Sequence, residues 1–74
     1  MKQIYNQILV SKIAKRVKTL RESRGITQEV FYFDTNIHIA RIETAKANIS
    51  VSTLDAICTY LDISLGDFFT GLSD

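Results

Sequence analysis

The chain has 74 residues, of which 46% are hydrophobic and 23% are charged, so it can build one small domain with a single core but not two domains. Its single cysteine excludes an internal disulfide framework and suits a reducing compartment. No apolar run approaches the roughly eighteen residues of a membrane span, and residues 1–10 lack the apolar core and cleavage site of a secretion signal. We therefore expect a cytoplasmic protein with no membrane partner.

The net charge of +1 hides an uneven distribution of charge along the chain. Residues 1–24 contain seven basic residues and one acidic residue, a net charge of +6, whereas residues 25–74 contain two basic and seven acidic residues, a net charge of −5. Such a division is expected of a protein that offers one face to a polyanion, and equally of a first helix whose outer face is solvated.

The spacing of apolar residues favours helices over strands. The sequence has no proline and three glycines, and its apolar residues recur at intervals of three and four. We predict helices over about residues 11–23, 28–33, 36–44, 53–61 and 65–70, with Gly25 ending the first. Polar residues that can cap these helices precede them: Ser11, Thr27, Asp34 or Thr35, Ser52 or Thr53, and Ser64, the last with Asp67 as a capping box.

Short connections between these helices predict a single domain over residues 11–74. Residues 1–10 form either an N-terminal arm or an extension of the first helix, and their β-branched residues also allow a strand that pairs with another chain. Cys58 should face inward from the fourth helix. The predicted core consists of Ile13, Val17, Leu20, Phe31, Ile39, Ile42, Val51, Leu54, Ile57, Leu61, Ile63, Leu65, Phe68 and Phe69.

Two short capped helices joined by a tight connection describe a helix-turn-helix. The segments "RGITQE", "IARIE" and "STLDAICTYLDISLGDFF", in this order and spacing, resemble the phage repressor and Cro-type, or Xre-like, helix-turn-helix family over residues 12–70. The resemblance implies an all-α, five-helix, lambda-repressor-like DNA-binding domain.

The sequence departs from that family at several positions. Three residues are missing between Thr27 and Ile39, which rotates a helix by about 300° and so nearly preserves its facing if helix 2 or the turn is shortened. Tyr32 replaces a small alanine, so helices 2 and 3 should pack farther apart or at a tilt. Ala45 and Asp62 replace glycines that follow helices 3 and 4, and we expect these two helices to end differently because the left-handed conformation favours glycine.

A recognition helix enters the major groove by its N-terminal end, where first-turn side chains reach the base edges. On the predicted boundaries, Asn36 can make a bidentate contact to adenine, Thr35 or Ile37 can pack against a thymine methyl, and His38 can donate to guanine or to a phosphate. Asp34 is better explained as a helix cap, because phosphate repels a carboxylate.

One turn further along helix 3, Arg41 can reach guanine or the backbone, with a surface ion pair as the alternative. By resemblance, Gln28 holds a phosphate and supports the first base contact, while Thr44, Lys46 and Asn48 follow the backbone.

Arg21 and Glu43 have a different role in this interpretation. The resemblance implies that the arginine of helix 1 pairs with the glutamate that ends helix 3, as a buried structural ion pair. A buried pair returns little net energy, but removal of one partner leaves a buried charge.

We therefore predict a sequence-specific transcriptional regulator, a repressor or autoregulator, that binds double-stranded DNA as a homodimer on a pseudo-palindromic operator. Helix 5 and residues 1–10 are the expected dimer surfaces. The alternative is a protein-interaction module, antitoxin-like or partner-binding, that keeps the fold. No catalytic arrangement, metal-binding cluster or phosphate loop is present in the sequence, so we expect no enzyme activity, cofactor, metal or small-molecule ligand.

Overall fold

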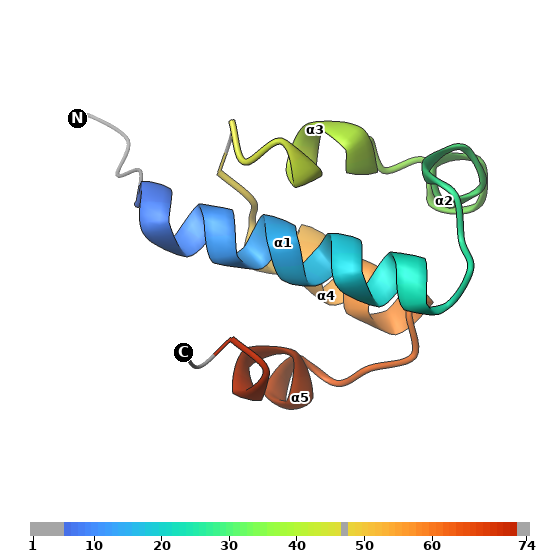
Figure 1. Cartoon of the computed structure of the whole chain (residues 1–74). Coiled ribbons are helices and arrows are strands. Elements are labelled where there is room, and N and C mark those ends of the chain that lie inside the picture. The colour runs from blue at the N-terminus through green and yellow to red at the C-terminus, as the bar shows by residue number, and fades with distance from the viewer. Residues whose placement is uncertain (1–5, 47, 73–74) are drawn as a thin grey trace.

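A computed structural model describes residues 6–46 and 48–72, and this part of the chain forms five helices. They are α1 (Gln7–Ser23), α2 (Gln28–Thr35), α3 (Ile39–Glu43), α4 (Val51–Tyr60) and α5 (Leu65–Thr70). Figure 1 shows α1 crossing the middle of the molecule, with α3 on one side of it, α5 on the other, and α4 behind. The prediction of an all-α, five-helix fold is confirmed for these residues.

The start of α1 differs from the prediction because of Asn6. The Asn6 side chain accepts a hydrogen bond from the Leu9 amide at 3.0 Å and caps the helix, so α1 begins four residues earlier than expected. Ser11 therefore lies inside the helix, and its hydroxyl accepts from Gln7 at 3.0 Å. Residues 7–10 extend the first helix; the expected arm or strand at residues 1–5 lies outside the described residues.

The boundary between the second and third helices also differs from the prediction. Thr27 caps α2 as expected, with its hydroxyl 3.1 Å from the Val30 amide, but α2 continues to Thr35. It ends at Asn36, whose left-handed conformation (φ 61°) lets its amide donate to the Tyr32 carbonyl at 2.7 Å. The predicted start of the third helix at residue 36 was wrong, because a left-handed residue interrupts the helix there. The α2–α3 connection is Asn36–His38.

The last two helices are both capped by serine. Ser50 accepts from the Thr53 amide at 3.1 Å, so α4 begins before Ser52 and Thr53, the residues predicted to cap it. Ser64 accepts from the Asp67 amide at 3.0 Å, which confirms the predicted cap of α5.

Most of the predicted core is buried. Phe31, Ile57 and Phe68 have no exposed surface, and Cys58 is buried as expected, with burial raising the pKa of its thiol. Val51 and Phe69 were wrongly assigned to the core. Both are exposed, at 72% and 45%, because Val51 is the first residue of α4 and Phe68 takes the inward position on α5. Val10, which the predicted core did not include, is buried on α1, as is Ala14.

Helices α3 and α4 end as if glycine were present. Ala45 and Asp62, which follow the two helices, have φ values of 58° and 59°. At the end of α4, the Asp62 amide donates to Thr59 and the Ile63 amide to Cys58, a pair of hydrogen bonds that requires a left-handed residue. Gly25 ends α1 with the same conformation (φ 67°). The expectation that α3 and α4 would end differently was therefore wrong; at the end of α4, the two hydrogen bonds impose the conformation despite its cost to a residue with a Cβ.

Arg16 of α1 and Arg24, the C-cap of α1, join the first helix to the last two. Arg16 donates from Nε to the Phe68 carbonyl at 2.9 Å and from Nη2 to the Asp67 carbonyl at 3.1 Å, and its guanidinium lies 5.6 Å from the centre of the Phe68 ring. Arg24 donates to the carbonyl of Leu61, the C-cap of α4. A cation is favourable at the negative end of a helix, so these contacts stabilise both helix termini.

Candidate nucleic-acid interface

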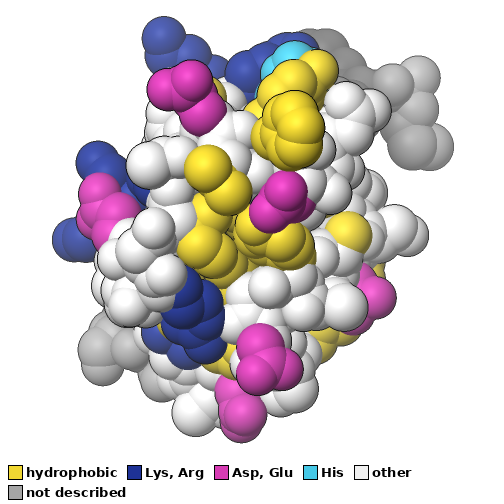
Figure 2. Space-filling model, turned by 90° about the vertical axis from the view of Figure 1, so that its right-hand side faces the viewer, with side chains coloured by type: hydrophobic (Ala, Val, Ile, Leu, Met, Phe, Trp, Pro, Cys, Tyr) yellow, Lys and Arg dark blue, Asp and Glu magenta, His cyan; other side chains and the backbone are white. Residues whose placement is uncertain are grey.

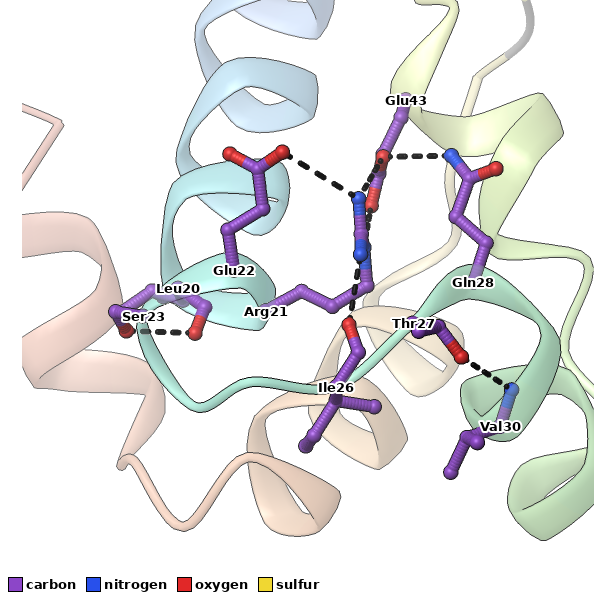
Figure 3. A network of polar contacts seen from close by, with 9 residues as sticks. All are labelled: Leu20, Arg21, Glu22, Ser23, Ile26, Thr27, Gln28, Val30 and Glu43. Carbon is purple, nitrogen blue, oxygen red and sulfur yellow. Dashed lines mark hydrogen bonds and ion pairs between the residues drawn. The ribbon is translucent and has the colours of Figure 1, made fainter.

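A buried ion pair fixes α3 to α1. Arg21 donates from Nε to Glu43 at 2.7 Å and from Nη2 to the other carboxylate oxygen at 3.1 Å, and their side chains are only 8% and 4% exposed. A third donation, from Nη1 to the Ile26 carbonyl at 2.7 Å, holds the connection that leads into α2 (Figure 3). The hydrogen bond to Glu43 raises the pKa of Arg21. The predicted ion pair is therefore present, and it links α1, α3 and the start of α2.

Gln28 belongs to the same network. Its Nε2 donates to Glu43 Oε1 at 2.9 Å, so the carboxylate is bound from α1 and from α2 at once (Figure 3). Gln28 itself is exposed, and its second amide hydrogen and carbonyl remain able to bond outward. The negative charge that ends α3 is thereby neutralised by Arg21 and held inward, away from any anion that approaches α3.

The outer side of α3 carries the residues expected to meet DNA. Ile39 is buried, whereas Ala40 and Arg41 are exposed. Two shallow hollows adjoin on this side, and Arg41 lines both. One hollow is also lined by Asn36, Ile37, His38, Ile42, Asn48 and Thr53, and the other by Ala40, Thr44 and Lys46.

Seven of the nine predicted DNA-contact residues line these hollows: Asn36, Ile37, His38, Arg41, Thr44, Lys46 and Asn48. The other two, Gln28 and Thr35, do not line either hollow. Lys46 and Arg41 are the basic residues among the lining residues, so a phosphate or a base edge that enters the hollows meets positive charge beside neutral polar groups.

Thr35 and Asn36 do not lie in the first turn of the third helix, as the predicted boundaries required. Thr35 is the last residue of α2, where its hydroxyl donates to the Phe31 carbonyl at 2.7 Å and accepts from the Ile37 amide at 3.1 Å. Asn36 supplies the left-handed conformation (φ 61°) that ends α2. Both residues therefore shape the turn, while the exposed side chain of Asn36 still borders the hollow.

His38 precedes α3 at the N-cap position, where its side chain makes no capping hydrogen bond. Its ring instead lies against the ring of Tyr32 on α2, with 4.6 Å between ring centres and an angle of 33° between ring planes. Tyr32, which was expected to push α2 and α3 apart, is 42% exposed and thus lies at the surface of the turn.

Sequence reasoning missed Ala40 and Tyr32 as members of this surface. The spacing of Ile39 and Ile42 indicates that residue 40 faces outward. Because the third helix was predicted to begin at residue 36, the base contacts were assigned mainly to the first turn of that predicted helix. No sequence signal indicated that the rings of Tyr32 and His38 would meet, since that contact depends on the left-handed conformation of Asn36.

The surface of α2 has a different character. Figure 2 shows hydrophobic side chains gathered on the face at the α2 end of the molecule, beginning beside the histidine. The exposed large apolar residues of α2 are Val30, Tyr32 and Phe33, and Phe33 is 88% exposed. Glu29 and Asp34 also lie on α2, so this helix presents apolar and acidic groups rather than basic ones.

The described residues contain no group of three or more histidine, cysteine, aspartate or glutamate side chains that could hold a metal ion. Within the same part of the chain, every helix is too short or too polar to cross a membrane.

Two adjacent helices, a three-residue connection and an exposed second helix with a polar face define a helix-turn-helix protein of the DNA-binding kind. The family comparison agrees: residues 17–68 match the helix-turn-helix family HTH_3, and the chain belongs to this family, of the Xre or Cro/C1 type. The prediction of a sequence-specific DNA-binding transcriptional regulator is confirmed at this level. A search of curated proteins gave no match.

Among solved structures, the chain is similar to the restriction-modification controller protein C.Esp1396I. One structure, a tetramer of that protein in complex with its natural 35 base-pair operator, is 31% identical, with a TM-score of 0.78 over 86% of this chain and 88% of that chain. A second structure, a point mutant of the same controller protein, is 29% identical, with a TM-score of 0.79 over 97% of this chain and 90% of that chain.

Proposed function

We propose that this protein is a cytoplasmic transcriptional regulator that binds a pseudo-palindromic operator as a homodimer, with α3 in the major groove. The observation that carries the proposal is the outer side of α3, where Arg41 lines two hollows whose other lining residues are mostly polar or basic. The C.Esp1396I controller protein, which binds an operator as a tetramer, supports both DNA binding and assembly into oligomers.

Within this proposal, His38, Ala40 and Arg41 face the bases, and Gln28, Thr44, Lys46 and Asn48 contact the backbone. Asn36 and Ile37 border the same hollow, whereas Thr35 acts through the turn. Arg21 and Glu43 hold α3 at its angle to α1 and do not read sequence. Base contacts of this kind specify the site, while phosphate contacts fix the position of the domain on it.

Dimerisation is assigned to α5, with residues 1–10 as the second candidate surface. The outward residues of α5 include Phe69, which is 45% exposed, and the half-buried Leu65 and Leu72 lie near it in the sequence. An isolated monomer of this size offers few phosphate contacts, and two half-sites about 34 Å apart double the length of sequence that is read.

Selection from random double-stranded DNA tests the proposal. We expect an enriched pair of inverted half-sites, and affinity for the enriched site should fall about tenfold or more when the salt concentration is raised fourfold. Failure to enrich any sequence would refute the proposed function.

A second candidate function is a module that binds another protein. The exposed apolar residues of α2, above all Phe33, favour it, because a helix face that lacks an intramolecular partner can be covered by another chain. An apolar protein interface should respond little to the same change in salt, which separates the two functions.

A further inference from the structure

We infer that Tyr32, a residue of α2, positions His38 for its contact with DNA. The inference rests on the proposed function, because it requires that His38 faces the operator. It concerns the packed rings of the two residues, of which Tyr32 lies on α2 and His38 is the last residue of the α2–α3 connection.

The geometry places His38 in one orientation. The ring centres of His38 and Tyr32 are 4.6 Å apart with an interplanar angle of 33°, a separation at which aromatic rings attract one another. His38 makes no hydrogen bond as a helix cap, so its ring is left available for this contact. The exposed edge of the imidazole borders the hollow that also contains Arg41 and Asn48.

The backbone supports the same arrangement. The Asn36 amide donates to the Tyr32 carbonyl at 2.7 Å, so the residue that supplies the aromatic ring also accepts the hydrogen bond of the residue that ends α2. His38 then follows two residues later and returns to the Tyr32 ring. Tyr32 thus acts on His38 by packing, and Tyr32 itself does not line the hollows beside α3.

Packing of this kind should increase affinity for DNA. A free histidine side chain must lose rotational freedom when it meets a base or a phosphate, and a ring already held in place loses less. We expect loss of the Tyr32 ring to weaken operator binding by about two- to tenfold, the range given by immobilising one side chain.

A double-mutant cycle on the selected operator tests the inference. Affinity is measured for the unmodified protein, for Tyr32→Ala, for His38→Ala and for the double variant. We expect the double variant to bind no more weakly than His38→Ala, because each change removes the same contact. Tyr32→Phe, which keeps the ring, should bind as the unmodified protein does, and Tyr32→Leu, which keeps bulk without an aromatic face, should resemble Tyr32→Ala.

Phe33→Ala is the matched control, since Phe33 is an adjacent aromatic residue of α2 with 88% exposure. It should leave operator affinity unchanged. A thermal melt of each variant confirms that the binding differences belong to folded protein. The base preference opposite His38 should change in the same way in Tyr32→Ala and in His38→Ala, which loss of stability alone would not produce.

The outcomes separate this inference from the proposed function. Suppose that the unmodified protein selects an operator. If the losses of affinity in Tyr32→Ala and His38→Ala are additive, or if His38→Ala has no effect on affinity, the inference is overturned while the proposed function stands. If no DNA sequence is selected at all, both fail together.

Discussion

Arg41 occupies the middle of the surface that faces away from the core, and it lines both hollows beside α3. If it contacts a base, Arg41→Ala should lose about 1–3 kcal/mol on the preferred operator and relax the choice of base at one position. Titration against the preferred operator and against single-base variants measures both effects. Equal weakening on every DNA sequence would instead assign Arg41 to a phosphate.

The ion pair between Arg21 and Glu43 leads to a prediction about stability. Glu43→Gln leaves the Arg21 guanidinium buried without its counter-charge, which should cost about 3–5 kcal/mol. For a domain of this size, the melting temperature should fall by more than about 10 °C. The selected operator should stay the same, because neither residue reads sequence.

Glu22→Gln is the matched control for this change. Glu22 also lies beside Arg21, at 4.0 Å, but its side chain is 58% exposed. Removal of its charge should change stability by less than about 0.5 kcal/mol. A melting temperature that Glu43→Gln leaves unchanged would contradict the structural role of the pair.

At the residue scale, the sequence predicted a residue's role best where the family resemblance fixes both the residue type and its position. Arg21 and Glu43 could be paired in advance by resemblance, and the structure contains that pair. The role of Asn36 could not be predicted, because asparagine suits both a base contact and a left-handed turn, and only the backbone distinguishes the two.

The ends of α3 and α4 lead to a prediction at the scale of elements. Ala45 and Asp62 adopt left-handed conformations that cost a residue with a Cβ about 1–2 kcal/mol. Ala45→Gly should therefore stabilise the protein by about 1 kcal/mol, after allowance for the greater freedom of glycine in the unfolded chain. Asp62→Gly should gain less, since aspartate tolerates this conformation better than alanine. Denaturant unfolding of the variants measures these differences.

Gly25→Ala provides the control in the opposite direction. Gly25 has φ of 67°, and a Cβ at this position would meet no atom within 4 Å, so the change tests backbone conformation without a clash. It should destabilise the protein by about as much as Ala45→Gly stabilises it. A stabilising Gly25→Ala would show that the helix ends carry no such cost.

Helix existence was predictable from the sequence, but two helix starts were not. The segment before α4 contains Ser50, Ser52 and Thr53, each of which can cap a helix, and local sequence does not choose among them. The same holds for α1, where Asn6 and Ser11 compete. The start of α3 was misplaced for another reason: the left-handed Asn36 ends α2, and the connection lies where the third helix was predicted to begin.

For the molecule as a whole, the contacts of Arg16 give a stability prediction. Arg16→Ala removes two hydrogen bonds from the guanidinium to the end of α5 and its contact with Phe68. Because the group is partly exposed, we expect a loss of about 1–2 kcal/mol in the free energy of unfolding. Lys15→Ala removes an exposed neighbouring charge and should change stability by less than about 0.5 kcal/mol.

A DNA-binding role for Arg16 would give the reverse result. In that case Arg16→Ala would leave the unfolding curve in place and reduce the salt dependence of operator binding by about one phosphate contact. The two measurements on one variant therefore distinguish a structural arginine from a phosphate-binding one.

The division of charge along the sequence gave an incomplete view of the surface. The +6 of residues 1–24 was interpreted as a face for a polyanion or as a solvated helix, yet Arg16, Arg21 and Arg24 bind carbonyl or carboxylate groups of the protein itself. Their partners lie far along the chain, at Phe68, Glu43 and Leu61, and local sequence patterns do not reveal such contacts.

The contacts of these three arginines within the protein have a consequence for how the proposed regulator would find its target. Arg41 and Lys46 are the cations that line the hollows at α3, so we expect α3 itself to make few phosphate contacts and to add little to binding of random-sequence DNA. Under the proposed function, we expect fewer copies to be bound non-specifically along the chromosome than if α3 carried more cations. A small rise in copy number should then increase the concentration of free protein, and with it the occupancy of the correct promoter, almost in proportion.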